Sequence, residues 1–428
     1  MKRISAVLLS GALVACASRG STVPMAPKRS PHFGPVSANL HLGGTVYAYV
    51  DIDGDAERVA DFLLSLLPAT QRSRASRPVG AASLVRDLGL DNLRAVGLSS
   101  YKKESLYHNQ SFIYHTGPRK GLLKVFGGEP TALGLKTIAP EGADLVWEQQ
   151  LNLRVLVDIV RTLGERGIGV SPARLDALLT ERLFDLDITV GEIVERLDTT
   201  VGLVLELDQK RMMRIPGESV RFPFTEFLFQ IDGLGDLVDA IAKKAAFNPF
   251  IQADRTNQWL IVRPGIRLPP PWNAYEPSMI KDVTTGRMYL VSNPAYLTKC
   301  LSQQSDLTAT ADFKRAFDGL PTIGNGMVFA SAQLTREMHG VLDRVINHGG
   351  STILTTIVRL LLPDAGSPIG WVGMNRNDGV SFTSNSSSSH KSTFITFGYA
   401  ALLPAIAVLG ASRLDPAPAP AAPSLPFP

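Results

Sequence analysis

The chain has 428 residues, of which 45% are hydrophobic and 19% are charged, a composition that excludes a largely disordered protein. Its 43 basic and 39 acidic residues give a formal net charge of +4. No run of four or more basic residues occurs in the chain, which argues against nucleic acid as a partner. We therefore expect a folded body of ordinary surface charge.

The first residues have the three parts that are typical of an export signal. A basic pair precedes an apolar run at residues 4–13, and the sequence LVAC follows. Such a run is too short to span a bilayer, which needs about 20 residues. The four letters LVAC resemble the bacterial lipobox. By that resemblance, cleavage follows Ala15 and Cys16 becomes the acylated first residue of the mature chain, since several acyl chains suffice for stable anchoring. A plain secretory signal with an unrelated cysteine is the alternative.

Four further segments are predicted to lie outside a packed core. Residues 16–37 are rich in Ser, Pro, Gly and Ala, which predicts a flexible tether behind the signal peptide of residues 1–15. Residues 393–412 contain no charged residue and are long enough for a transmembrane helix, although a buried core element is the alternative. Residues 413–428 form a Pro/Ala-rich tail. The Ser-rich run at residues 381–389 reads as a spacer before the apolar segment.

The body contains two pairs of similar segments. Residues 46–64 and 227–241 each begin with an apolar strand, continue through a turn with Asp and Gly, and end in a helix with apolar spacing. Residues 145–163 and 327–346 share a second strand and helix. Both alignments have an offset of about 180 residues, which indicates a tandem duplication.

The predicted repeats cover residues 38–220 and 221–385. Residues 95–114 and 369–383 are expected to form hairpins, the second with an Asp-Gly turn. Thr189 begins a capping-box pattern that predicts a helix start. Strands joined by hairpins, with helices between them, predict an α+β fold with largely antiparallel sheets and packed helices.

A family resemblance rests on three stretches of the second repeat, MYLVSNPAYLTKCL, LTATADFKRAFDGLP and GMVFASAQL. They resemble an uncharacterised family of exported bacterial domains, whose members repeat a strand, a helix that begins at Ser/Asn-Pro, a short helix around a Phe, and another strand. The match is clearest over residues 286–335 and looser over 40–385. The resemblance implies an exported α+β domain and supplies no catalytic residues.

Motifs for catalysis or metal binding are incomplete. The acidic triplet Asp51–Asp55 lacks the glycine and glutamate of a calcium loop, so helix capping explains it better. Ser99 and Lys102 have Ser-x-x-Lys spacing, but they fall in a predicted strand instead of at a helix start. His108 and His115 are seven apart and would point to opposite faces of a strand. We expect surface or edge histidines, no metal site and no cofactor.

Two arginines and one cysteine need a separate interpretation. Arg154 and Arg336 align in the two repeats, each in the predicted first turn of its helix. One interpretation is a paired anion site. The other is that both guanidinium groups are solvated while the aliphatic parts of the side chains pack against the protein. With Cys16 acylated, Cys300 has no partner for an intramolecular disulfide, so a small buried side chain is expected there.

These patterns favour a lipoprotein anchored in the bacterial membrane or envelope, with its body exported from the cytoplasm. We expect a non-catalytic structural or binding role. The partners would be membrane lipid through Cys16 and, in addition, an envelope protein or an apolar ligand. The alternative is an envelope hydrolase whose active site leaves no short motif. A deep polar cleft with converging ionisable groups would favour the enzyme, and an apolar groove would favour binding.

Overall fold

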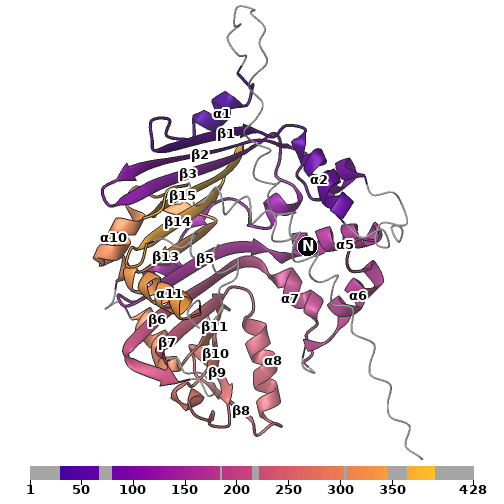
Figure 1. Ribbon diagram of the computed structural model, residues 1–428. Coiled ribbons are helices and arrows are strands. Elements are labelled where there is room, and N and C mark those ends of the chain that lie inside the picture. The colour runs from indigo at the N-terminus through magenta and orange to yellow at the C-terminus, as the bar shows by residue number, and fades with distance from the viewer. Residues whose placement is uncertain are drawn as a thin grey trace, which may run out of the picture.

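The computed structural model describes residues 29–66, 80–183, 186–214, 221–302, 306–345 and 364–390. These residues form a mixed α+β fold around one 13-stranded sheet in which neighbouring strands are antiparallel. The predicted α+β class with an antiparallel sheet is confirmed. In Figure 1 the strands follow one another from β1 at the top to β8 at the bottom, with α10 and α11 at the left and α5 and α6 at the right.

The order of strands across the sheet is β1-β2-β3-β15-β14-β13-β5-β6-β7-β11-β10-β9-β8, and β4 pairs with β12 in a separate small sheet. In chain order the strands are β1 (Val46–Asp51), β2 (Leu93–Lys103), β3 (Leu106–His115), β4 (Thr131–Ala132), β5 (Leu145–Asn152), β6 (Asp198–Arg214), β7 (Arg221–Ile231), β8 (Ile251–Arg255), β9 (Trp259–Pro264), β10 (Ser278–Asp282), β11 (Met288–Val291), β12 (Ile323–Gly324), β13 (Gly326–Ala330), β14 (Ile369–Asn375) and β15 (Gly379–Ser386).

The α-helices of the described residues are α1 (Phe33–Ser37), α2 (Asp55–Leu66), α4 (Ala81–Asp87), α5 (Leu153–Glu165), α6 (Pro172–Thr180), α7 (Val190–Arg196), α8 (Gly235–Ala245), α9 (Pro294–Leu301), α10 (Ala311–Phe317) and α11 (Ala332–Val345). Short 3-10 helices are η1 (Gly121–Lys124), η2 (Leu135–Thr137), η4 (Trp272–Ala274) and η5 (Leu307–Ala309).

Local sequence signals account for several of these elements. β2 and β3 form the predicted hairpin, and its turn contains Glu104 at a φ of 54°, the left-handed conformation that two-residue hairpin turns require. β14 and β15 form the second predicted hairpin. Thr189 and Glu192 make the capping box at the start of α7, and Asn293 caps α9 ahead of Pro294. Each signal acts within a few residues, so neighbouring sequence suffices to predict it.

The sheet has a core on each face. Side chains alternate between faces along a strand, so Val204 and Leu228 point to the first face while Val201 and Ile231 point to the second. The first face packs against α9 and α10, and the second packs against α7 and α8. We refer to these as the first and second faces below.

The predicted pairs of similar segments are both strand–helix units. The strands of β5–α5 and β13–α11 lie next to each other, since β5 pairs with β13 and Trp147 is the partner of Val328. β1–α2 and β7–α8 both turn through a glycine of positive φ, Gly54 at 78° and Gly233 at 81°. However, β1 is an edge strand, whereas β7 lies between β6 and β11.

The two predicted repeats do not form separate sheets. β3 of the first half pairs with β15 of the second, and β5 of the first pairs with β13 of the second. The described parts of both halves therefore share one continuous sheet.

Two segments that the sequence placed outside the body belong to it. Residues 33–37 of the predicted tether form α1, whose Val36 is fully buried in a cluster with Phe112. The Ser-rich run at 381–389 includes most of β15, which lies between β14 and β3. The expectation of a spacer is wrong because the polar side chains of this run hydrogen-bond with neighbouring strands, which makes an interior position tolerable.

The anchoring predictions lie outside the described residues. Ala15, Cys16, the apolar segment 393–412 and the tail 413–428 are all in those parts of the chain. Within the described ranges, no helix combines the length and the apolar character needed to cross a bilayer.

Candidate functional site: an apolar pocket on the sheet

A pocket on the second face is floored by strands β3, β14 and β15. Ile113, Trp371 and Phe382 line it. Trp371 and Phe382 stack with ring centroids 5.6 Å apart and planes inclined by 21°. They are diagonal neighbours in the ladder, since Phe382 pairs with Gly373. The floor of the pocket is thus a flat aromatic surface.

Gly373 makes this stacking possible. A Cβ added at Gly373 would lie 2.7 Å from Cη2 of Trp371 and 3.3 Å from Cδ1 of Phe382. Because real Cβ atoms do not approach other atoms so closely, the indole can lie across the strand only where no side chain stands.

η1 and the segment that follows it form the opposite wall. Leu122, Leu123 and Phe126 line the pocket from this side, and Phe126 is 56% exposed. Asn375 at the end of β14 holds the segment in place. Its Nδ2 donates to the carbonyl oxygens of residues 126, 127 and 128 at 3.2, 3.1 and 3.0 Å, and its backbone N–H donates to Oδ1 of Asn325 at 2.7 Å.

The resulting cavity has a volume of about 400 Å³, and none of its described lining residues carries a charge. The side-chain amides in the lining bond mainly to backbone groups, and Asn325 Nδ2 donates to the carbonyl oxygen of Gly128 and to Oε1 of Gln150 beside the pocket. The remaining surface is mostly aromatic and aliphatic. Pockets of this size and chemistry suit an uncharged apolar group.

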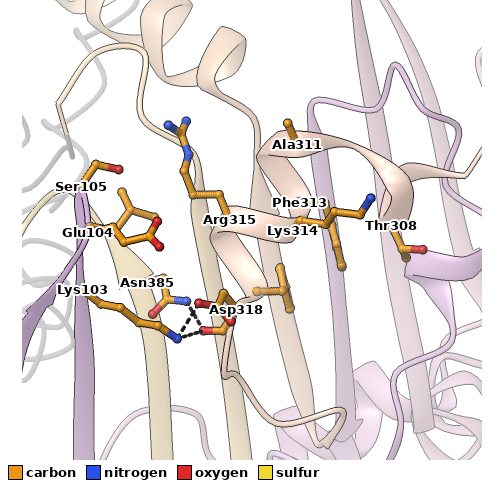
Figure 2. A pocket seen from close by; sticks show the side chains of 12 residues that line it. Lys103, Glu104, Ser105, Thr308, Ala311, Phe313, Lys314, Arg315, Asp318 and Asn385 are labelled. Atoms are coloured by element: carbon orange, nitrogen blue, oxygen red, sulfur yellow. Dashed lines mark hydrogen bonds and ion pairs between the residues drawn. The ribbon is translucent and has the colours of Figure 1, made fainter.

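A second cavity, of about 610 Å³, lies between the β2–β3 turn and α10. Figure 2 shows Lys103 and Glu104 on one side and Arg315 on the other. The Nζ of Lys103 is 2.5 Å from Oδ2 of Asp318, and Asn385 Nδ2 donates to the carbonyl oxygen of Asp318 at 2.9 Å. Asp318 is exposed, and ion pairs of this kind contribute about 0–1 kcal/mol. Among the described ionisable groups that line this cavity, Lys103 is paired with Asp318 and Arg315 with Asp312.

A serine and a histidine meet on the second face, one rung from the apolar pocket. Ser111 pairs with Phe382 across the ladder, and its Oγ is 3.1 Å from Nε2 of His390. That nitrogen lies at the same distance from the carbonyl oxygen of Gln110. When Nε2 carries a hydrogen and donates it to this carbonyl, the nitrogen cannot also accept the proton of Ser111. The Nδ1 of His390 has no hydrogen-bond partner among the described residues. Burial lowers the pKa of His390 to about 4. The described residues thus supply no carboxylate to orient this imidazole as in a catalytic triad.

The expectation of surface or edge histidines is wrong for three of them. His108, His115 and His390 are all buried, and burial lowers the pKa of each. Hydrogen bonds make the first two positions tolerable: His108 Nδ1 lies 2.8 Å from Oδ1 of Asn385, and His115 Nδ1 lies 3.1 Å from the carbonyl oxygen of Gly117.

Two buried carboxylates, those of Glu148 and Asp144, accept hydrogen bonds from nearby backbone N–H groups. Glu148 accepts hydrogen bonds from the backbone N–H groups of Gly134 and Leu135 at 3.1 and 2.7 Å. Asp144 accepts from the N–H of Leu207 at 2.8 Å. Burial raises the pKa of both groups. They are four residues apart along an extended chain, about 13 Å, so they do not form a catalytic pair.

The structure does not bring Arg154 and Arg336 together. β5 and β13 are antiparallel neighbours, so α5 and α11, which follow them, begin at opposite ends of the sheet, about 25 Å apart. Arg154 is the second residue of α5, whereas Arg336 is the fifth of α11 and lies beyond the first turn. A shared anion site is therefore not formed.

The remaining residues that the motif search singled out make local hydrogen bonds and ion pairs or are buried in the core. Oδ1 of Asp51 accepts the N–H of Asp53 at 3.1 Å, and Asp53 pairs with Arg94 at 3.3 Å. Across the described part of the chain, no three His, Cys, Asp or Glu residues are grouped so that they could hold a metal ion. Ser99 is fully buried in β2, and Cys300 is 2% exposed, as expected for a small core residue.

Comparisons with protein-family models, curated proteins and solved structures gave no match to this chain. The resemblance seen in residues 286–335 therefore stays a prediction.

The apolar pocket was missed in the sequence because its residues come from distant segments. The strand IGWVGMN at residues 369–375 is the part of the sequence that could have indicated the pocket. Gly373 lies two residues after Trp371 and therefore on the same face of the sheet. A glycine at such a position leaves that face open beside the tryptophan, which is typical of a site where a ligand approaches the strand closely.

Proposed function

We propose that the protein is a lipoprotein of the bacterial envelope that binds an apolar ligand in the pocket on the second face. The observation that carries the proposal is the uncharged cavity over the stacked Trp371 and Phe382. Its volume suits an acyl-chain segment or a small flat hydrocarbon. A binding role is favoured over catalysis because the described lining residues include no nucleophile.

A fluorescence titration tests the binding site. The uncharged probe N-phenyl-1-naphthylamine is added to the full chain and to the variants Trp371→Ala and Phe382→Ala. Each variant removes one ring of the floor and should weaken binding about tenfold. Trp272→Ala is the matched control, because Trp272 lies in η4 and lines no part of the pocket. Equal affinity in all three variants would place the probe elsewhere.

The anchor is proposed at Cys16, with cleavage after Ala15. Cells that express the full chain are fed a labelled fatty acid, and the protein is followed through membrane fractionation. Cys16→Ser should abolish labelling, and unchanged labelling would reject the anchor. Truncation after residue 390 in the Cys16→Ser protein tests the second proposed anchor, at 393–412. If the segment spans, the truncated protein should become extractable from the membrane fraction by alkaline carbonate, whereas the untruncated Cys16→Ser protein should resist extraction.

The alternative of an envelope hydrolase rests on the contact between Ser111 and His390. A fluorophosphonate probe distinguishes it from binding alone. Labelling that disappears in Ser111→Ala would favour the hydrolase, because only an activated serine reacts with such a probe. We expect no labelling at this residue.

We also infer that the body arose by an internal duplication. The strands that correspond in the two copies differ in part from those that the sequence alignment paired. From the β13–β5 pair outward, the order β13-β14-β15-β3-β2-β1 on one side corresponds to β5-β6-β7-β11-β10-β9 on the other. In this correspondence β1 matches β9 instead of β7. Superposing the two sets of six strands in this order, which is circularly permuted along the chain, tests the inference, since unrelated sets of strands would not superpose.

A further inference from the structure

Three large apolar side chains protrude at the end of the molecule that carries α8 and β8. Phe247 is 90% exposed and Phe250 is 63% exposed, both in the turn between these elements, and Ile266, just after β9, is 56% exposed. We call these three residues the apolar tip. In Figure 1 α8 and β8 lie at the lower end, opposite β1.

Hydrogen bonds order the tip. The N–H of Gly265 donates to the carbonyl oxygen of Phe250 at 2.8 Å, which places Ile266 beside the phenylalanines. The N–H of Phe247 donates to the carbonyl of Lys244 at 3.0 Å, and that of Phe250 donates to Oδ1 of Asn248 at 2.9 Å. The side chains therefore project from a hydrogen-bonded turn.

Unpaired basic residues flank the tip. Lys243 and Lys244 are in the last turn of α8, and Arg267 follows Ile266. None of the three forms an ion pair with any residue that the structure describes, whereas nearby acids are paired, as Asp254 is with Arg263 at 2.9 Å. The charge left over around the tip is therefore positive.

We propose that the apolar tip inserts into the interface of an anionic lipid bilayer. Apolar side chains that enter the acyl boundary, with Lys and Arg at headgroup level, are the combination that holds proteins on such surfaces. A protein partner fits less well. Three side chains supply about 500 Å², below the about 800 Å² that each side of a specific protein interface buries. This contact is separate from any anchor at Cys16.

A depth measurement at the tip tests the proposal independently of how the rest of the chain binds. A nitroxide is attached at Phe247→Cys in the full chain with Cys16→Ser, where the buried Cys300 is inaccessible to the label. Vesicles of phosphatidylglycerol should raise the accessibility of the nitroxide to oxygen and lower it to a water-soluble nickel chelate. Val59→Cys is the matched control, because Val59 is also 56% exposed but lies on α2.

Equal water accessibility at both positions would overturn the proposal. So would immobilisation of the Phe247→Cys label that rises with protein concentration and needs no vesicles, because that result assigns the tip to contacts between copies. Changing Lys243 and Lys244 to Glu should weaken the insertion into phosphatidylglycerol vesicles at least about tenfold. Phosphatidylcholine vesicles, which carry no net charge, should show little insertion of either protein.

Discussion

Trp371 and Phe382 stack across neighbouring strands, with ring centroids 5.6 Å apart. The contact is diagonal because Trp371 pairs with Ser384 and Phe382 pairs with Gly373. One face of this aromatic pair is left to line the apolar pocket. The shape of the pocket thus depends on the absence of a side chain at Gly373.

We expect Gly373→Val to close the pocket. The added carbons would meet the indole of Trp371, so the probe should bind at least about tenfold more weakly, and overpacking should lower the free energy of unfolding by about 1–3 kcal/mol. Titration with N-phenyl-1-naphthylamine and urea unfolding measure the two effects. Gly128→Ala is the control, since its added methyl meets no atom within 4 Å. Retained affinity in Gly373→Val would contradict the assignment of the site.

Asn375→Ala should loosen the wall of the pocket. The change removes the donor that three carbonyl oxygens share, which should lower the free energy of unfolding by about 2 kcal/mol. Limited proteolysis should also cut faster between residues 118 and 130. Asn377→Ala changes an exposed residue of the same hairpin and should have little effect. Equal cleavage rates for the two variants would argue against this role.

Stability should fall as pH falls from about 7 to 4. His390 has a pKa of about 4 in the folded protein, against an ordinary value of 6.5. Over this interval the unfolded chain gains a proton that the native state does not, so the free energy of unfolding should drop by roughly 3 kcal/mol. Above pH 7 this contribution is fully present. Urea unfolding at several pH values measures the slope, which His390→Gln should reduce. The same slope in that variant would refute the explanation.

Cys300 should be unreactive in the folded protein. Its thiol is buried, and burial raises its pKa to about 12, so almost no thiolate exists at pH 8. In the Cys16→Ser protein, Ellman's reagent should detect no thiol before unfolding and one thiol in guanidinium chloride. Rapid reaction of the native protein would show that the core around α9 opens.

The correct sequence predictions all concern interactions between residues that are close together in the sequence. The β2–β3 hairpin and the capping box at Thr189 each depend on residues a few positions apart. By contrast, the Ser-rich run of β15 was misread because its partners, such as His108 for Asn385, are 277 residues away. Polarity alone does not distinguish a solvated linker from an interior strand whose side chains are hydrogen-bonded.

The sequence by itself determined the local elements with strong signals, such as the β2–β3 hairpin and the start of α7, together with the α+β class and the pattern that predicts an anchor at Cys16. Those features follow from local backbone preferences and from motifs read along the chain. Only the tertiary structure decided which strands are neighbours, and so it placed Arg154 and Arg336 at opposite ends of the sheet. It also joined Ile113, Phe126 and Trp371 around one cavity. The physical reason is that pairing between distant strands depends on the packing of the whole sheet, which no short segment of the chain contains.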